Sequence, residues 1–285
     1  MNAARFIVEH ETALRLGSFV LVLAVLAVAE RAWPVRGDAR PARRQFSNLA
    51  LMAIDTALLR LAFPLLAATL ALSVHARGGG LFGLLSLPAW LEIVVAVLIL
   101  DATIYWQHRL MHAIPLLWRM HRVHHTDTAF DVTLGVRFHP LEIALSMGVK
   151  LGAVWLLGPP AAAVVAFEIL LAAASLFTHT DVAFPGRWER ALRALVVTPS
   201  MHRVHHSVLR VETDSNYGFL LSGWDRLFRS YRRQQSRPER SMPIGLTPWR
   251  APAQLGLGAL LLQPFRRVPA PATARTTDYE DDLDA

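Results

Sequence analysis

Long apolar runs alternate with short polar segments along most of the chain. The runs cover residues 16–29, 49–74, 87–106, 141–157 and 161–177. Each approaches the roughly 20 residues that a helix needs to cross a bilayer. The last two are separated by Gly158-Pro159-Pro160, a strong helix-breaking turn, and so form a hairpin. The pattern predicts an all-α, polytopic membrane bundle with about four or five membrane helices.

The first apolar run has two interpretations. Ala27-Val28-Ala29 resembles the cleavage site of a signal peptide. The preceding segment lacks the positive charge of a signal peptide, because Glu9 and Glu11 offset its two arginines. We therefore favour a retained membrane helix.

The second run contains Asp55, Arg60 and Pro64. Charges at that depth usually face the interior of the bundle, where these two side chains would pair or approach a substrate path. The alternative is that they extend toward the membrane surface near one end of the helix.

Composition supports a membrane protein and limits its chemistry. The chain is 53% hydrophobic with a net charge of +7, and its arginines mostly flank the apolar runs, so we expect contact with lipid headgroups and no nucleic acid. Residues 31–47 carry five arginines, which places this loop in the cytoplasm by the positive-inside rule. With no cysteine, disulfides and thiolate ligands are excluded. A metal must be bound by histidine and carboxylate.

Ten of the twelve histidines lie between His108 and His206. They fall into one His-x3-His group and two His-x2-His-His groups, with two more between them. At these spacings the imidazoles of each group share one face of a helix. Counting helices from the cytoplasmic loop places residues 108–139 and 179–206 on the same side, in a cytosolic helical cap. Because a zinc site takes about four ligands, ten imidazoles indicate two neighbouring metals in one cage.

Ligand type does not select the metal, because imidazole suits zinc, copper, iron and nickel. The chain has neither a His-Glu-x-x-His protease motif nor a phosphate-binding loop. A redox pair beneath an apolar channel suits oxygen activation, with two irons, O2 and external electrons. Two alternatives stay open: a membrane protein that binds or transports divalent metals, and a zinc-dependent hydrolase with the same cage.

The motifs resemble those of the fatty acid hydroxylase/sterol desaturase superfamily of membrane di-iron enzymes. The first half of the resemblance is Asp101-x3-Tyr105-Trp106-x-His108-Arg109-x2-His112, Leu117-Trp118-Arg119-x-His121-Arg122-x-His124-His125 and Arg137-Phe138-His139-Pro140-Leu141-Glu142. The second half is Phe177-Thr178-His179, Pro199-x2-His202-Arg203-x-His205-His206, Asp214-x-Asn216-Tyr217-Gly218 and Trp224-Asp225-Arg226-Leu227-Phe228.

The resemblance implies iron ligands at nine histidines: His108, His112, His121, His124, His125, His179, His202, His205 and His206. His139 is the tenth candidate and either binds a metal or orients a ligand. Candidates for orienting the ligands are Asp101, Glu142, Asp214 and Asn216, unless they are helix caps or ordinary ion pairs. No catalytic side chain is expected beyond the metal centre.

The sequence therefore predicts a membrane monooxygenase with two iron ions, exchangeable for zinc on purification, and O2 as co-substrate. It would hydroxylate, or less favourably desaturate, a lipid-like substrate from the bilayer, such as a fatty acyl chain, sterol or ether lipid. Because no haem-binding His-Pro-Gly-Gly motif is present, electrons would come from a separate ferredoxin, cytochrome or reductase. The expected location is a bacterial inner membrane, with the histidines on the cytoplasmic side.

We divide the chain into N-terminal membrane helices and a basic loop (1–87), a hydroxylase-like di-iron unit (88–235), and a C-terminal interfacial segment with a disordered tail (236–285).

Overall fold

The computed structural model describes residues 3–63, 66–233 and 235–268. Within these ranges all regular elements are helical, which confirms the predicted class. Five stretches are long and apolar enough to cross a membrane, and the chain is an integral membrane protein. They are α2 (Glu11–Ala32), Ala42–His75, α5 (Ala89–Ala113), α7 (Pro140–Leu157) and α8 (Ala161–Thr178).

The second span is interrupted. It consists of α3 (Ala42–Ala62) and α4 (Ala67–His75) instead of the one continuous helix predicted over 49–74. Proline at position 64 lacks the N–H that a continuous helix requires, which accounts for the break. The basic loop is also shorter than predicted, because α3 already begins at Ala42.

The third membrane helix extends further than predicted. The apolar run ends near Trp106, but α5 continues to Ala113 and includes His108 and His112. The helix ends at Ala113, two residues before Pro115, since the residue preceding a proline is disfavoured in the helical region. Ile114 is extended, and Pro115 starts α6 (Pro115–His125). The first histidine group therefore belongs to the last turns of a membrane helix.

The core of the membrane part is built around α8. This helix packs against α2, α4 and α5, and about half of its residues are buried. The turn between α7 and α8 lies directly against the connection between α4 and α5. Gly158 has φ +62°, and a Cβ atom there would lie 2.0 Å from the carbonyl oxygen of Gly79. Only glycine fits both the conformation and the space.

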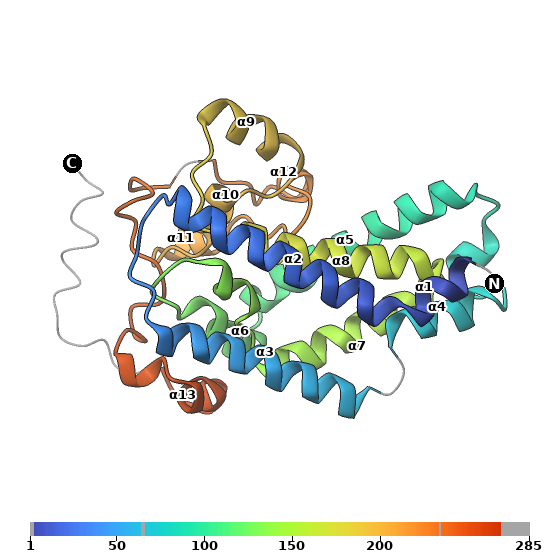
Figure 1. The fold of residues 1–285 in the computed structure, drawn as a ribbon, viewed down its shortest axis with the longest axis horizontal. Coiled ribbons are helices and arrows are strands. Elements are labelled where there is room, and N and C mark those ends of the chain that lie inside the picture. Colours follow the sequence, from blue (N-terminus) through green and yellow to red (C-terminus); the bar gives the residue numbers. More distant parts are fainter. Residues whose placement is uncertain (1–2, 64–65, 234, 269–285) are drawn as a thin grey trace.

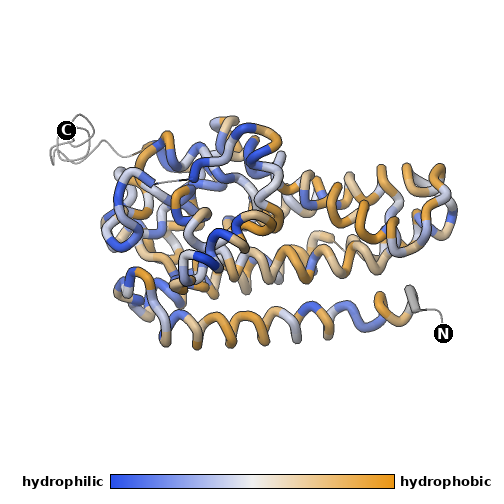
Figure 2. The backbone as a smooth tube through the Cα atoms, turned by 90° about the horizontal axis from the view of Figure 1, so that it is seen from above, coloured by the Kyte–Doolittle hydropathy of each residue, from blue (hydrophilic) through white to orange (hydrophobic). Residues whose placement is uncertain are grey.

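The remaining elements form a cap at one end of the bundle (Figure 1). They include η2 (Val132–Val136), α9 (Gly186–Leu195), α10 (Pro199–His205), α11 (Arg210–Thr213), α12 (Gly223–Leu227), η3 (Pro252–Gln254), α13 (Leu257–Leu262) and η4 (Gln263–Phe265). Two short helices, α1 (Ala3–Glu9) and η1 (Leu81–Leu84), lie at the other end. Hydrophilic residues gather in the cap, whereas the opposite end is mostly apolar (Figure 2).

The C-terminal apolar stretch is part of this cap. The predicted C-terminal interfacial segment includes the apolar stretch 255–262, and its contact with the membrane surface stays a prediction. In the structure Leu260 is buried with Leu51 of α3 and Val123 of α6, so α13 packs on the protein. We predicted that the tail is disordered from Pro264 onward, but Pro264 is buried in η4 and its carbonyl accepts from Arg119 at 2.6 Å, so the start of that prediction is wrong. The rest of the predicted tail, from residue 269, lies outside the described residues.

Candidate metal centre

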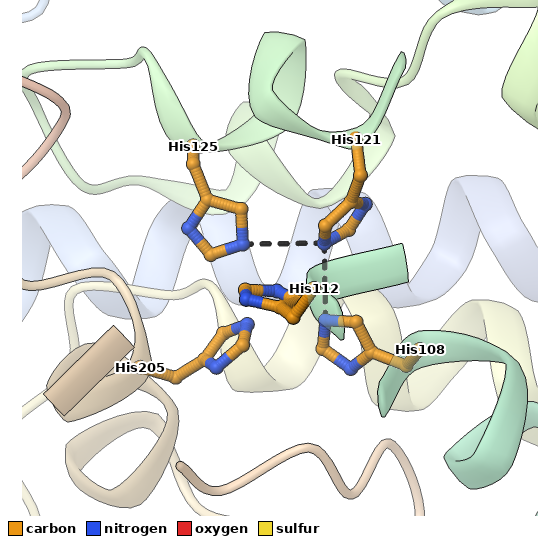
Figure 3. A group of neighbouring side chains, drawn as sticks. All are labelled: His108, His112, His121, His125 and His205. Carbon is orange, nitrogen blue, oxygen red and sulfur yellow. Dashed lines mark hydrogen bonds between the residues drawn. The ribbon is translucent and has the colours of Figure 1, made fainter. Parts of the chain in front are cut away.

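Nine histidines converge in the cap as two adjoining groups. One consists of His108, His112, His121, His125 and His205, and the other of His124, His179, His202 and His206. All nine are buried, and the ligand atoms within each group lie within 4.8 Å of one another. Figure 3 shows the rings of the first group pointing toward a common centre from α5, α6 and α10. We call these groups centre A and centre B.

The doubled histidines explain how two centres form from so few elements. Neighbouring residues on a helix point about 100° apart. His124 of α6 therefore faces centre B while His125 faces centre A, and the same division separates His206 from His205 after α10. The His125 and His206 rings stack at 4.5 Å between centroids, so the centres share a wall.

Backbone carbonyls fix the tautomers of four rings. Nδ1 of His108 contacts the Tyr217 carbonyl at 2.7 Å, and Nδ1 of His124 contacts the Arg137 carbonyl at 3.1 Å. His179 and His205 make the same kind of contact with the carbonyls of residues 175 and 215. Because a carbonyl only accepts, Nδ1 must donate its proton, which leaves a lone pair on Nε2 of the neutral ring.

These lone pairs point at one another. The Nε2 atoms of His124 and His179 are 3.0 Å apart, and those of His108 and His121 are 3.1 Å apart. His121 is equally constrained, because its Nδ1 faces a carboxylate oxygen of Glu142 at 2.7 Å. Two nitrogens without a proton between them repel unless a cation binds both. Ligand atoms about 2.1 Å from one ion and at right angles to each other are about 3 Å apart, which matches the observed spacing.

Other ring nitrogens also favour the binding of a cation by these imidazoles. The Nε2 atoms of His112 and His205 are buried without a hydrogen-bond partner among the described residues. Burial lowers the pKa of His124, His125, His202 and His206 well below the usual value, and nearby imidazoles lower it further. Burial also lowers the pKa of His179 to about 4 and that of His205 to about 3. The rings are therefore neutral near pH 7, which is the form that binds metals.

Two of the four candidate orienting residues contact a histidine. Glu142 accepts from His121, as described, and an Asp214 oxygen lies 3.4 Å from Nδ1 of His112. The carboxylates thereby hold rings on α6 and α5 from outside the centre. This arrangement is typical of metal-binding histidines.

The other two candidates act on the frame. Asp101 accepts from the Trp224 indole at 2.7 Å and from the Leu221 amide, which attaches α12 to α5. Asn216 has φ +53° and donates to the carbonyl of Met201 at 3.0 Å. It lies between the two residues whose carbonyls hold the rings of His205 and His108, so it positions that backbone segment.

His139 lies in neither group. Its Nδ1 accepts from the Leu141 amide at 3.1 Å and caps α7, and its Nε2 contacts the Leu261 carbonyl at 3.1 Å. Both ring nitrogens are thus engaged at the junction of α7 with α13.

The backbone carbonyls of residues 137, 175, 215 and 217 were not among the candidates. They act through main-chain oxygen atoms, which every residue has, so no sequence signal distinguishes them. Only the folded chain brings them to the histidines.

A cavity leads from centre A into the membrane part. It has a volume of about 340 Å³ and is lined by His108 and His121 together with residues of α2, α3, α7 and α8, such as Phe19, Met52 and Ile143. Its walls are mostly apolar. The cavity thus connects the rings of centre A with the membrane helices.

Fold and site together define a polytopic helical membrane protein with two groups of histidines that could each hold a metal ion at one end of its bundle. A sequence model of the fatty acid hydroxylase family matches residues 93–230, which include all nine clustered histidines. Residues 93–230 therefore belong to the fatty acid hydroxylase family, within the superfamily that the motifs resemble.

Characterised relatives are similar over part of their length. An ornithine lipid hydroxylase of Rhizobium tropici is 31% identical over 208 residues, 72% of this chain and 59% of the relative. The alkylglycerol monooxygenase of Homo sapiens is 29% identical over 50% of this chain and 31% of the relative, and that of Danio rerio is 30% identical over 48% and 30%. The chain thus spans less than two thirds of these relatives. No solved structure matches it.

Proposed function

We propose that the protein is a membrane monooxygenase that uses two iron ions, O2 and external electrons to hydroxylate a lipid-like substrate. The observation that carries the proposal is the pair of adjoining histidine centres, one of which opens on an apolar cavity among membrane helices. The names of the relatives, a lipid hydroxylase and two alkylglycerol monooxygenases, support the same reaction class. Hydroxylation remains our preference over desaturation.

We assign the five histidines of centre A to one iron and the four of centre B to the other. When bound, the irons would supply the redox chemistry that activates O2 for oxidation of a C–H bond. The protein residues hold neutral nitrogen donors at fixed positions, and the Glu142 carboxylate makes His121 a stronger donor. The cavity walls would position the substrate beside centre A. We propose that His139 caps α7 and binds no metal.

We also propose that the histidine end faces the cytoplasm of a bacterial cell, with the protein in the inner membrane. The five arginines of residues 31–47 support this orientation, since this segment connects α2 to α3 at the end of the bundle that carries the centres. Electrons would then come from a separate cytoplasmic ferredoxin, cytochrome or reductase. The family match over 93–230 lies within our proposed di-iron unit, 88–235.

The decisive experiment is metal analysis of anaerobically purified protein, combined with O2 consumption in the presence of lipid and an added electron donor. We expect two irons per chain and O2 uptake coupled to a lipid product with one added oxygen atom. Stoichiometric zinc without O2 uptake would favour a hydrolase, and ion flux in proteoliposomes would favour a transporter. Comparing lipid extracts of cells with and without the gene by mass spectrometry would identify the substrate.

A further inference from the structure

Charged side chains line the cavity that leads to centre A, although it lies among membrane helices. Three carboxylates, Asp55, Glu142 and Glu168, face it together with two cations, Arg15 and Lys150. Ionisable groups at such a depth are costly and usually paired. Their pairing therefore indicates which of them is available to a ligand.

Both cations are bound to the same carboxylate. Glu168 of α8 forms an ion pair with Lys150 of α7 and another, at 3.3 Å, with Arg15 of α2. Glu142 is engaged with His121. These contacts leave one carboxylate of the cavity with neither an ion pair nor a hydrogen bond among the described residues.

That carboxylate is Asp55. Its side chain is buried, with 6% exposure, and it has no ion pair or hydrogen bond among the described residues. Arg60, its nearest cationic neighbour in the sequence, points instead to Thr12 at 3.4 Å and lines an adjacent cavity. The pairing of Asp55 with Arg60 that the sequence allowed is therefore not formed.

Further acceptors of the same cavity are also unsatisfied. Gln107 donates through Nε2 to Ser146, but its Oε1 atom is buried without a donor, as is Oε2 of Glu142. Ser146 and Glu142 lie four residues apart on α7 and thus on one face of that helix. The cavity next to centre A therefore offers three acceptor groups that lack a donor, and one of them is an unpaired carboxylate.

We propose that the cavity binds a lipid with a basic amine and that Asp55 holds the ammonium group. An ammonium group brings a positive charge and several N–H donors, which match the acceptors left open by Asp55, Gln107 and Glu142. An apolar or purely hydroxylated lipid would leave the Asp55 carboxylate buried without a partner. This inference rests on the proposed function and names the substrate class of the same cavity.

Binding of two probes with the same chain tests the proposal. Radiolabelled dodecylamine and dodecan-1-ol are equilibrated with the full chain in nanodiscs, and uptake into empty nanodiscs is subtracted. We expect the amine to bind at least about tenfold more tightly than the alcohol, as for a charge-assisted hydrogen bond in a buried site. Asp55→Asn should reduce binding of the amine to the level of the alcohol and leave binding of the alcohol unchanged.

Two further variants control the experiment. Asp55→Glu keeps the charge and should keep a preference for the amine. Glu92→Gln removes a carboxylate of α5 that does not line the cavity, and should retain the full preference. Equal affinities of the wild-type chain for the two probes would overturn the inference, as would an unchanged preference in Asp55→Asn.

The metal content of each sample separates this inference from the proposed function. Asp55 contacts none of the clustered histidines, so Asp55→Asn should retain both metals. An iron-loaded protein that oxidises lipid but shows no preference for the amine would overturn only the inference. A preference for the amine in a protein without O2-dependent activity would overturn the proposed function but would support the amine-binding site.

Discussion

Removal of single histidines should separate the two centres. In His124→Ala, centre B keeps three of its four histidines, and the Arg137 carbonyl loses its donor. Loss of a group that only orients a ligand typically weakens metal binding 10–100-fold. Loss of a ligand should exceed this, so we expect binding at least about 100-fold weaker, or about 2.7 kcal/mol. Purified His124→Ala should contain close to one metal per chain.

The two centres should respond differently. His205→Ala leaves centre A with four of its five histidines, as many as intact centre B has. It should therefore retain more metal than His124→Ala. His139→Ala is the matched control, because it removes a histidine that caps α7 outside both groups. It should cost about 1 kcal/mol of stability, as loss of a helix cap does, and keep both metals.

The assay is elemental analysis of the three variants after gel filtration in detergent, with unfolding curves on the same samples. We expect His139→Ala to contain the most metal, His205→Ala less, and His124→Ala the least. If His139→Ala lost a metal while His124→Ala kept two, the division into two centres would be refuted.

Other perturbations follow from the contacts around the centres. Glu142→Gln keeps an acceptor for His121 but removes its charge, so metal affinity should fall about tenfold in a competition titration with a chelator, and unchanged affinity would contradict the role of Glu142. Arg44→Met leaves Asp131 buried without its cation and leaves Asp127 only its pair with Arg137 at 3.6 Å, so it should destabilise the fold by about 3–5 kcal/mol in detergent unfolding curves; a loss below 1 kcal/mol would count against this. Dialysis against a chelator should lower the thermal midpoint, because it leaves opposed lone pairs in the core, and an unchanged midpoint would show that the cap folds independently of metal.

Much of the architecture is encoded locally. Runs of apolar residues have the length of membrane helices whatever their neighbours, and His-x2-His-His places imidazoles on one helix face. The division of the doublets between centres is not local. Both histidines of the pair at 124 and 125 satisfy the same spacing rule. Only the rings that other elements bring to them, His179 and His206 to His124 and His112 and His205 to His125, assign them to different centres.

Two expectations depended on tertiary contacts in the same way. His139 is the same residue type as the nine clustered histidines. Pro140 begins α7 directly after it, however, so His139 caps that helix. For Asp55 and Arg60 the sequence left three roles open: pairing, approach to a substrate path, or extension to the membrane surface. The two residues lie on one helix, five residues apart, and line different cavities. In each case the residue type limits the possible roles, and the neighbours supplied by distant segments decide among them.

The arginine inside each His-Arg-Val-His-His motif shows what those distant segments contribute. Arg122 donates to the carbonyls of Gln263 and Arg266, whereas Arg203 forms an ion pair with Glu239 at 2.8 Å. Each arginine thus holds its short histidine helix to a segment beyond residue 235. A helix as short as α10 is not stable alone, so its histidines stay in place only because such contacts fix it. The described C-terminal segment, which has no metal-binding residues, is therefore part of the frame that makes two centres from two repeated motifs.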